Sequence, residues 1–284
     1  MDLSEKIKND DLLNVLRDVS SVAASLGIPF FVIGAMARDI VLECGYGIQP
    51  SQATLDIDLG VQVADWEEFQ AITKGLVASG EFTTSRAAQK LFHQKSKLPV
   101  DIIPFGKIAS SRGEISWPPK HDVDMNILGF EEAYAHALPV QLSKDLQILF
   151  ASPAGWALLK IISWNDRDRS KRVKDAQDLA LILQNYADAG NIDRLYDEES
   201  ALIQEEGHDL RYAGARLLGR DLAKITKQET VQSVLEILER ETLDQSQYHL
   251  VVEMSPNRIS ESDNFEYHMK LLLKLKQGVL EIVG

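Results

Sequence analysis

The pattern of hydrophobic and polar positions divides the chain into a first part that mixes helices with strands and a second part that is helical. In the first part, apolar residues spaced three and four positions apart predict helices at 9–26, 35–44 and 65–79. Short apolar or alternating runs predict strands at 28–33, 54–63, 81–85, 89–95, 98–105, 138–142 and 146–150. From Pro153 onward the spacing predicts helices at 153–166, 171–187, 199–206, 210–226, 229–242 and 264–282, with a loop at 253–263.

This change in pattern predicts a domain boundary near residue 151. We expect residues 1–151 to form a mixed sheet with helices, and residues 152–284 to form an all-helical domain. The fold class predicted for the whole chain is therefore α+β. At 284 residues the chain is long enough for two ordinary domains.

Two acids stand out in the expected strand 54–63. Asp56 and Asp58 lie two positions apart, so their side chains emerge on the same face, while the apolar residues between them face the other way. Like charges at a separation of about 5–7 Å repel each other, and burial increases the repulsion. A divalent cation between them would remove this cost.

A third acid, Asp101, lies inside another apolar strand, 98–105. Three carboxylates on two neighbouring strands are the ligand set of a two-metal phosphoryl-transfer site, in which the metals lie about 3.5–4 Å apart. The alternative is an exposed sheet face with scattered acids and no metal, and the Asp56–Asp58 pair alone favours that alternative. The third acid, together with a glycine turn upstream, shifts the balance toward a metal site.

The glycine turn is formed by Gly34 and Ala35, which take the chain directly from strand 28–33 into helix 35–44. Glycine permits close approach of the backbone to a ligand, and the free N–H groups at a helix start can hold phosphate oxygens. Arg38 adds a positive charge one turn into the helix. Such a join is equally typical of a tight packing turn, so both interpretations stay open at this point.

The composition is that of a globular protein, with 45% hydrophobic and 26% charged residues. A formal net charge of −13 argues against general affinity for the nucleic-acid backbone, but not against a local site for one triphosphate. The single cysteine, Cys44, excludes a disulfide within the chain and fits a reducing compartment. No signal-peptide pattern is present, and no apolar run approaches the about 20 residues that span a bilayer. We therefore expect a cytoplasmic protein with no membrane segment.

Two common ligand-binding patterns are missing from the sequence. The six histidines have no paired spacing and no cysteine partner, so a zinc site is not expected. The sequence G-x-x-x-x-G-K-[ST] does not occur, which excludes an ordinary P-loop.

The order and spacing of the glycine turn and the acids resemble the DNA polymerase β-like nucleotidyltransferase superfamily. More closely, the chain resembles the bacterial nucleotidyltransferase-like proteins related to the AbiEii/AbiGii abortive-infection toxins. The resemblance covers about residues 28–187, and its best segments are GAMARD, ATLDIDLGV, VDIIPFG and LLKIISWNDRDRSKRVKDAQDL. It is specific for the fold and much less so for the substrate.

The resemblance implies a polymerase β-like nucleotidyltransferase domain that uses Mg²⁺ or Mn²⁺ and binds a nucleoside triphosphate. It assigns the metal and catalytic triad to Asp56, Asp58 and Asp101, and it assigns nucleotide contacts to Gly34, Ala35, Arg38, Thr54 and Lys160. The sequence departs from the family pattern at two positions. Ala35 stands where a second Gly or a Ser is common, and Gln52 stands where relatives tend to have Arg, which puts one triphosphate contact in doubt.

Lys160 interrupts an otherwise apolar helix and shares a face with Ser163, Trp164 and Arg167. In similar proteins a lysine at this position contacts the triphosphate, whereas the alternative is a surface lysine that extends its stem along the helix. On the following helix, Asp175 and Asp178 are expected to form an interhelical salt bridge to Arg167 or Lys171.

Two functions of different classes follow from these observations. The first is an enzyme that transfers a nucleoside monophosphate to an RNA end such as that of tRNA, to a protein hydroxyl or to a small molecule. The resemblance further implies a toxin with an antitoxin partner, in a toxin–antitoxin or phage-defence pair. The second is a non-catalytic module, either a nucleotide sensor or an interaction scaffold. The intact triad argues for the enzyme, and Ala35 and Gln52 argue weakly for the module.

Overall fold

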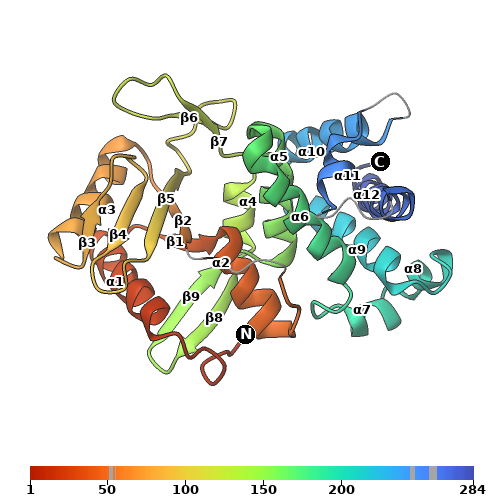
Figure 1. The fold of residues 1–284 in the computed structure, drawn as a ribbon, viewed down its shortest axis with the longest axis horizontal. Helices are drawn as coiled ribbons and strands as arrows, with labels where there is room; N and C mark the ends of the chain where they lie inside the picture. The colour runs from red at the N-terminus through yellow and green to blue at the C-terminus, as the bar shows by residue number, and fades with distance from the viewer. Residues whose placement is uncertain (51–53, 55, 244–246, 256–260) are drawn as a thin grey trace. The chain divides into compact units, whose positions relative to one another are not determined.

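The computed structural model describes residues 1–50, 54, 56–243, 247–255 and 261–284. The chain divides into two compact units, Met1–Ser152 and Pro153–Gly284, which are described separately (Figure 1).

The first unit is built on a seven-stranded mixed sheet with the strand order β3-β4-β5-β2-β1-β9-β8. β2 pairs in parallel with β5 and β1 pairs in parallel with β9, whereas the other neighbours are antiparallel. The strands are β1 (Phe30–Ile33), β2 (Ile57–Gln62), β3 (Phe82–Thr84), β4 (Lys90–His93), β5 (Pro99–Phe105), β8 (Leu138–Ser143) and β9 (Leu146–Phe150). All seven overlap strands predicted from the sequence. The central strands β5, β2 and β1 therefore lie beside one another, which brings the acid-bearing segments together.

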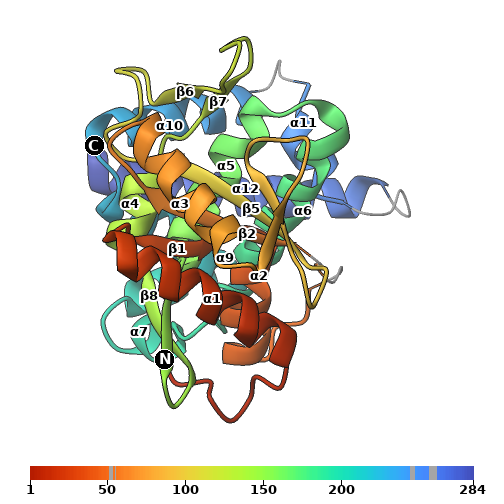
Figure 2. The same ribbon diagram turned by 90° about the vertical axis from the view of Figure 1, so that its left-hand side faces the viewer.

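Two helices of the first unit, α1 (Asp10–Leu26) and α3 (Trp66–Ala78), lie side by side along the sheet (Figure 2). The side chain of Asn9 caps α1 by accepting a hydrogen bond from the backbone N–H of Leu12, and Gly27 ends the helix in the left-handed conformation. The two helices approach closely at Gly75 of α3, where a Cβ atom would lie 2.9 Å from Cγ1 of Val22.

Three short elements of the first unit were not predicted from the sequence. β6 (Glu114–Ser116) and β7 (Asp124–Asn126) form a separate hairpin, and α4 (Phe130–Ala135) follows it (Figure 1). Strands of three residues are too short to show a period in the sequence, and long-range packing supports the hairpin instead. The ring of Trp117, beside β6, lies 5.5 Å from that of Trp66 at the start of α3.

The helix predicted at 35–44 is also different in the structure. It consists of a five-residue α-helix, α2 (Gly34–Arg38), which continues as a π-helix, η1 (Asp39–Gly45). The wider turns begin at Asp39, whose carboxylate bonds the side chain of Arg38 in α2 and the backbone N–H of Thr54. π-Helical turns are frequent at functional sites.

The second unit is entirely helical within its described residues. It consists of α5 (Pro153–Asp166), α6 (Arg169–Asn185), α7 (Ile192–Tyr196), α8 (Ser200–Glu205), α9 (Leu210–Ile225), α10 (Gln228–Thr242), α11 (His249–Glu253) and α12 (Glu261–Val283). The short helices α7 and α11 were not predicted. α12 begins three residues before the predicted helix 264–282, and residues 256–260 of the predicted loop lie outside the described part of the chain.

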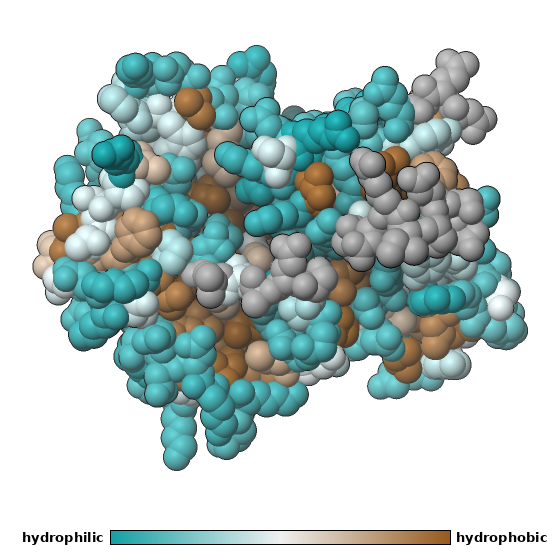
Figure 3. Space-filling model, viewed as in Figure 1, coloured by the Kyte–Doolittle hydropathy of each residue, from teal (hydrophilic) through white to brown (hydrophobic). Residues whose placement is uncertain are grey.

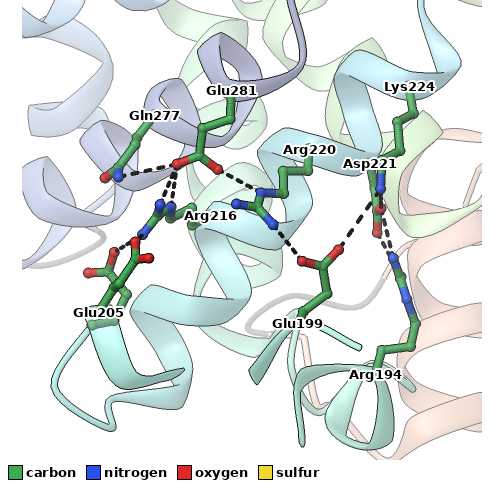
Figure 4. A network of polar contacts seen from close by, with 10 residues as sticks. Arg194, Glu199, Glu205, Arg216, Arg220, Asp221, Lys224, Gln277 and Glu281 are labelled. Carbon is green, nitrogen blue, oxygen red and sulfur yellow. Dashed lines mark hydrogen bonds and ion pairs between the residues drawn. The ribbon is translucent and has the colours of Figure 1, made fainter. Parts of the chain in front are cut away.

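The centre of the second unit is the contact between α9 and α12. The helices touch backbone to backbone, because a Cβ atom at Gly219 would lie 2.9 Å from the backbone nitrogen of Val279 and 3.0 Å from Cα of Gly278. An ionic network fixes the same pair of helices: Glu281 bonds both Arg216 and Arg220 of α9 (Figure 4).

Figure 3 shows a mostly hydrophilic face on which hydrophobic colour appears chiefly in recessed places. Among the helices of the described residues, none combines the length and the apolar character needed to cross a membrane.

Candidate active site

The acids of the candidate site come from adjacent strands. β2 and β5 are paired in parallel, and the register places Asp58 directly opposite Asp101. On its other side Asp58 is opposite Ile33, the last residue of β1. The neighbours of Asp101 along β5, Val100 and Ile102, are fully buried, which fixes the side of the strand on which the carboxylate emerges.

Asp56 lies just before β2, outside the regular strand, and residue 55 lies outside the described part of the chain. Strand alternation therefore does not by itself place Asp56. A local hydrogen bond does: the Thr54 hydroxyl donates to Oδ1 of Asp56 over 2.7 Å. The carboxylates of Asp56, Asp58 and Asp101 each offer an oxygen, and these atoms lie within 4.8 Å of one another. The structure thus brings together the three acids that the sequence suggested, and their role as ligands stays a prediction.

Gly34 lies against this cluster. Its φ of +66° is in the left-handed region, which favours glycine, and a Cβ atom there would lie 2.7 Å from Cγ of Asp58. Gly34 therefore leaves the space that the Asp58 carboxylate occupies. Ala35 follows as the second residue of α2. The proposed phosphate turn and the acids are next to each other.

Arg38 is buried, with 6% of its surface exposed, and its guanidinium is held by Asp39. Nε and Nη2 of Arg38 lie 2.7 and 2.6 Å from Oδ1 of Asp39. Burial raises the pKa of Asp39, while Arg38 and the backbone N–H of Thr54 act to lower it. Asp39 thus connects α2 to the segment that carries Asp56. Asp39 was not predicted as a site residue, and its signal in the sequence is the Arg–Asp pair that follows the glycine turn.

A lysine that was also missed completes the site. β4 pairs with β5 so that Lys90 is opposite Asp101, and Nζ of Lys90 lies 2.9 Å from Oδ2 of Asp101. Burial raises the pKa of Asp101, with Asp56 adding to the effect and Lys90 opposing it. The second oxygen of Asp101, Oδ1, is buried without a hydrogen-bond partner.

These residues fit a divalent cation. The donor set consists of carboxylate oxygens, which Mg²⁺ and Mn²⁺ prefer, and an unpartnered buried oxygen is costly unless something binds it. An ion held by Asp56, Asp58 and Asp101 would use the free Oδ1 of Asp101 and relieve the repulsion among the three charges.

Comparison with known proteins identifies the family. The model of the nucleotidyl transferase AbiEii toxins, of type IV toxin–antitoxin systems, matches residues 19–251. The chain belongs to this family. The resemblance and the α+β fold class inferred from the sequence are therefore confirmed. No curated protein matches the chain.

Solved structures similar to this AbiEii-family protein include two nucleotidyltransferase-like folds. A crystal structure of an antigenic nucleotidyltransferase-like protein from Paracoccidioides brasiliensis is 17% identical, with a TM-score of 0.41, and the match covers 72% of this chain and 93% of that one. The CCA-adding enzyme of Thermotoga maritima, in complex with tRNA, is 13% identical with a TM-score of 0.32; the match covers 99% of this chain and 85% of that enzyme.

In the second unit of the AbiEii-family protein, Lys160 is buried rather than extended along the surface. Its Nζ lies 2.8 Å from Oδ1 of Asp175 and 2.6 Å from Oδ2 of Asp178. Burial acts to lower the pKa of Lys160, but the two carboxylates outweigh it and raise the pKa. The alternative of a surface lysine is wrong, and the predicted salt bridge between Asp175 and Arg167 is present at 2.9 Å. A triphosphate contact by Lys160 stays a prediction.

A second group with metal-ligand chemistry lies elsewhere in the first unit and consists of Asp18, Glu81 and His93. Its internal hydrogen bonds account for it without a metal. The backbone N–H of Ser96 donates to Nδ1 of His93, and Nε2 of His93 lies 3.2 Å from Oδ2 of Asp18. Glu81 is paired with Lys95.

Proposed function

We propose that this protein transfers a nucleoside monophosphate from a nucleoside triphosphate to a hydroxyl group, with Mg²⁺ or Mn²⁺ at the triad of Asp56, Asp58 and Asp101. The observation that carries the proposal is the convergence of three carboxylates beside the glycine turn, with one buried oxygen of Asp101 unpartnered. In a cluster with a purely structural role, we would expect a hydrogen-bond donor of the protein to pair with that oxygen, because a buried oxygen without a partner lowers stability.

The three acids would have different roles in metal binding and proton transfer. Asp56 and Asp58 would hold both metals, and Asp101 would hold the catalytic metal and accept the proton of the attacking hydroxyl. Divalent ions bound there would lower the pKa of that hydroxyl and neutralise charge on the phosphoryl oxygens. The hydroxyl oxygen attacks the α-phosphorus, the bond from the α-phosphorus to the bridging oxygen breaks, and pyrophosphate leaves.

The nucleotide would be held by the turn and by residues around it. We propose that backbone N–H groups at Gly34 and Ala35 contact phosphate oxygens, as glycine-containing helix starts do. Arg38, Thr54 and Lys160 are further proposed contacts. Each of these three already bonds a carboxylate of the protein, so each would have to share that partner with the nucleotide. The remaining contact in doubt, at residue 52, lies outside the described residues.

The biological role that we propose is that of a toxin with an antitoxin partner, as the family to which the chain belongs implies. The acceptor would be an RNA end such as that of tRNA, a protein hydroxyl or a small molecule. The net charge of −13 makes a long RNA the least favoured of these.

The test combines labelling with thermal denaturation. The protein is incubated with each α-³²P-labelled triphosphate, Mg²⁺ or Mn²⁺, and whole-cell extract, and we expect one labelled acceptor and released pyrophosphate. Ligand at about 100 times its dissociation constant adds roughly 2.7 kcal/mol of stability. For a domain of about 150–250 residues that corresponds to an increase of about 5–10 °C in Tm.

Asp58→Asn is the matched variant. It should lose both the label transfer and the increase in Tm, while its metal-free form stays folded because one repulsive charge has been removed. An increase in Tm without turnover would instead support a nucleotide sensor. A melting curve that no triphosphate changes with either metal, in well-folded protein, would refute nucleotide binding and leave the scaffold.

A further inference from the structure

Lys90 is the cation that the metal-free triad already contains. The β4–β5 register places it opposite Asp101, and its Nζ lies 2.9 Å from Oδ2 of that residue. Asp101 shares the cluster with Asp56 and Asp58, whose carboxylate oxygens lie within 4.8 Å of one of its own, so the ammonium group faces the charge of all three. Lys90 thus belongs to the cluster electrostatically, although it comes from a strand that carries no acid of the triad.

The two carboxylate oxygens of Asp101 have different surroundings. Oδ2 is bonded to Lys90, whereas Oδ1 is buried and has no partner. An ammonium group is a single point charge with three donors and cannot bridge several carboxylates as a divalent ion does. Lys90 therefore compensates the cluster only in part, and three carboxylates against one ammonium leave two negative charges.

Lys90 also reaches the surface of the protein. Its side chain is 32% exposed, against 17% for Asp101, and a lysine stem of four carbons can turn outward without disturbing the strand. A divalent ion bound at the unpartnered Oδ1 of Asp101 would repel the ammonium group on Oδ2 of the same carboxylate and weaken that pair. The ammonium group would then lie at the edge of a site that a triphosphate approaches with its own negative charges.

We propose that Lys90 is an exchangeable counter-ion that competes with divalent metal for Asp101 and pairs with the triphosphate once the metal has displaced it. This inference rests on the proposed function of the triad. It predicts that metal alone binds weakly, and that metal and nucleotide bind with positive coupling, since each removes a cost from the binding of the other. Lys90 would then keep the site from filling with metal in the absence of substrate.

The test measures metal affinity directly, without turnover. Mn²⁺ binding is followed by calorimetry, with and without a non-hydrolysable α,β-methylene triphosphate, for the wild type, Lys90→Met and Lys90→Gln. We expect both variants to bind Mn²⁺ alone at least about tenfold more tightly, since removing a unit charge at contact distance has an effect of that order or larger. Coupling between Mn²⁺ and the analogue should fall in both variants.

Stability in the absence of metal gives a second readout. The metal-free variants should melt below the wild type, because Asp101 loses its ion pair with Lys90, and Mn²⁺ should restore them. Lys107→Met is the control. Lys107 is an exposed residue just after β5, outside the triad, so its removal should leave Mn²⁺ affinity unchanged.

Mn²⁺ binding by these variants separates a failure of the Lys90 proposal from a failure of the proposed function. If the wild type binds Mn²⁺ and Asp58→Asn does not, the triad is a metal site; equal or weaker Mn²⁺ binding by the Lys90 variants would then overturn the competition alone. If neither the wild type nor the Lys90 variants bind Mn²⁺, both proposals fall.

Discussion

The carboxylate of Asp58 fills the space that a side chain at Gly34 would need. A Cβ atom on residue 34 would lie 2.7 Å from Cγ of Asp58 and 2.9 Å from its Cβ, closer than real side chains approach. The same glycine has a φ of +66°, which other residues adopt only at a cost. Glycine is thus required at position 34 for two reasons: the backbone conformation there, and the space that the Asp58 carboxylate occupies.

Gly34→Ala is therefore expected to abolish nucleotidyl transfer. The new methyl group forces the Asp58 carboxylate out of its position beside Asp101, and the backbone strain should lower stability by about 1–2 kcal/mol. Steady-state turnover and urea denaturation measure the two effects.

The matched control is Gly27→Ala. Gly27 has the same φ of +66°, and a Cβ atom there would have nothing within 4 Å. This control should lose a similar amount of stability and keep its activity. Equal loss of activity in both variants would show that backbone strain, and not displacement of Asp58, is responsible.

Thr54 should act through Asp56. Its hydroxyl donates to Oδ1 of Asp56, and its backbone N–H bonds Asp39. Thr54→Val removes only the first of these bonds. Since a hydrogen bond to a charged group contributes about 1.5–3 kcal/mol, kcat should fall roughly 10- to 100-fold.

Thr54→Ser, which keeps the hydroxyl, should restore most of kcat. If Thr54 instead contacts the triphosphate, as the family resemblance implied, Thr54→Val would raise KM for the nucleotide and leave kcat nearly unchanged.

The acids of the site could be found from the sequence because two of them lie in strands with a clear apolar pattern. Asp58 and Asp101 stand out among buried neighbours, and parallel pairing of β2 with β5 then places them side by side. Asp56 was found for a partly incorrect reason, since it precedes the regular strand and is oriented by Thr54.

The counter-charges could not be found in the same way. Lys90 meets Asp101 only through the register of β4 on β5, which no local pattern in the sequence specifies. Lys160 was recognised as unusual in an apolar helix, yet its burial depends on two acids of α6 that face it. Sequence patterns show which residues are chemically out of place, whereas tertiary packing decides which opposite charge lies next to them.

Lys160→Met tests whether Lys160 serves the fold or the nucleotide. Lys160 is buried between Asp175 and Asp178, and its removal takes an ion-pair partner from each of these two buried carboxylates. Breaking a buried pair from one side costs about 3–5 kcal/mol, and we expect a loss of that size in the free energy of unfolding.

Lys174, an exposed residue of α6, provides the control, because Lys174→Met should change stability by less than about 0.5 kcal/mol. Adding Asp178→Asn to Lys160→Met should recover part of the loss. A Lys160→Met protein as stable as the wild type, with a raised KM for the triphosphate, would contradict the structural role and support the nucleotide contact.

Glu281 should make the stability of the second unit depend on pH. Burial acts to raise the pKa of Glu281, but hydrogen bonds and charge from Arg216 and Arg220 outweigh it, so the pKa is lowered from its ordinary value of 4.5 (Figure 4). A carboxylate with a lowered pKa stabilises the folded state above its unfolded pKa, and this contribution is lost as the pH falls through the folded pKa. Glu281→Gln should therefore be less stable than the wild type at pH 7, by about 1–3 kcal/mol. The difference should shrink as the pH is lowered below 4.5.

Glu239→Gln, on an exposed position of α10, is the control and should show no such trend. Urea denaturation at a series of pH values measures all three proteins. A deficit of Glu281→Gln that is the same at pH 4 and pH 7 would mean that lost packing, rather than the ionised carboxylate between the two arginines, accounts for the effect.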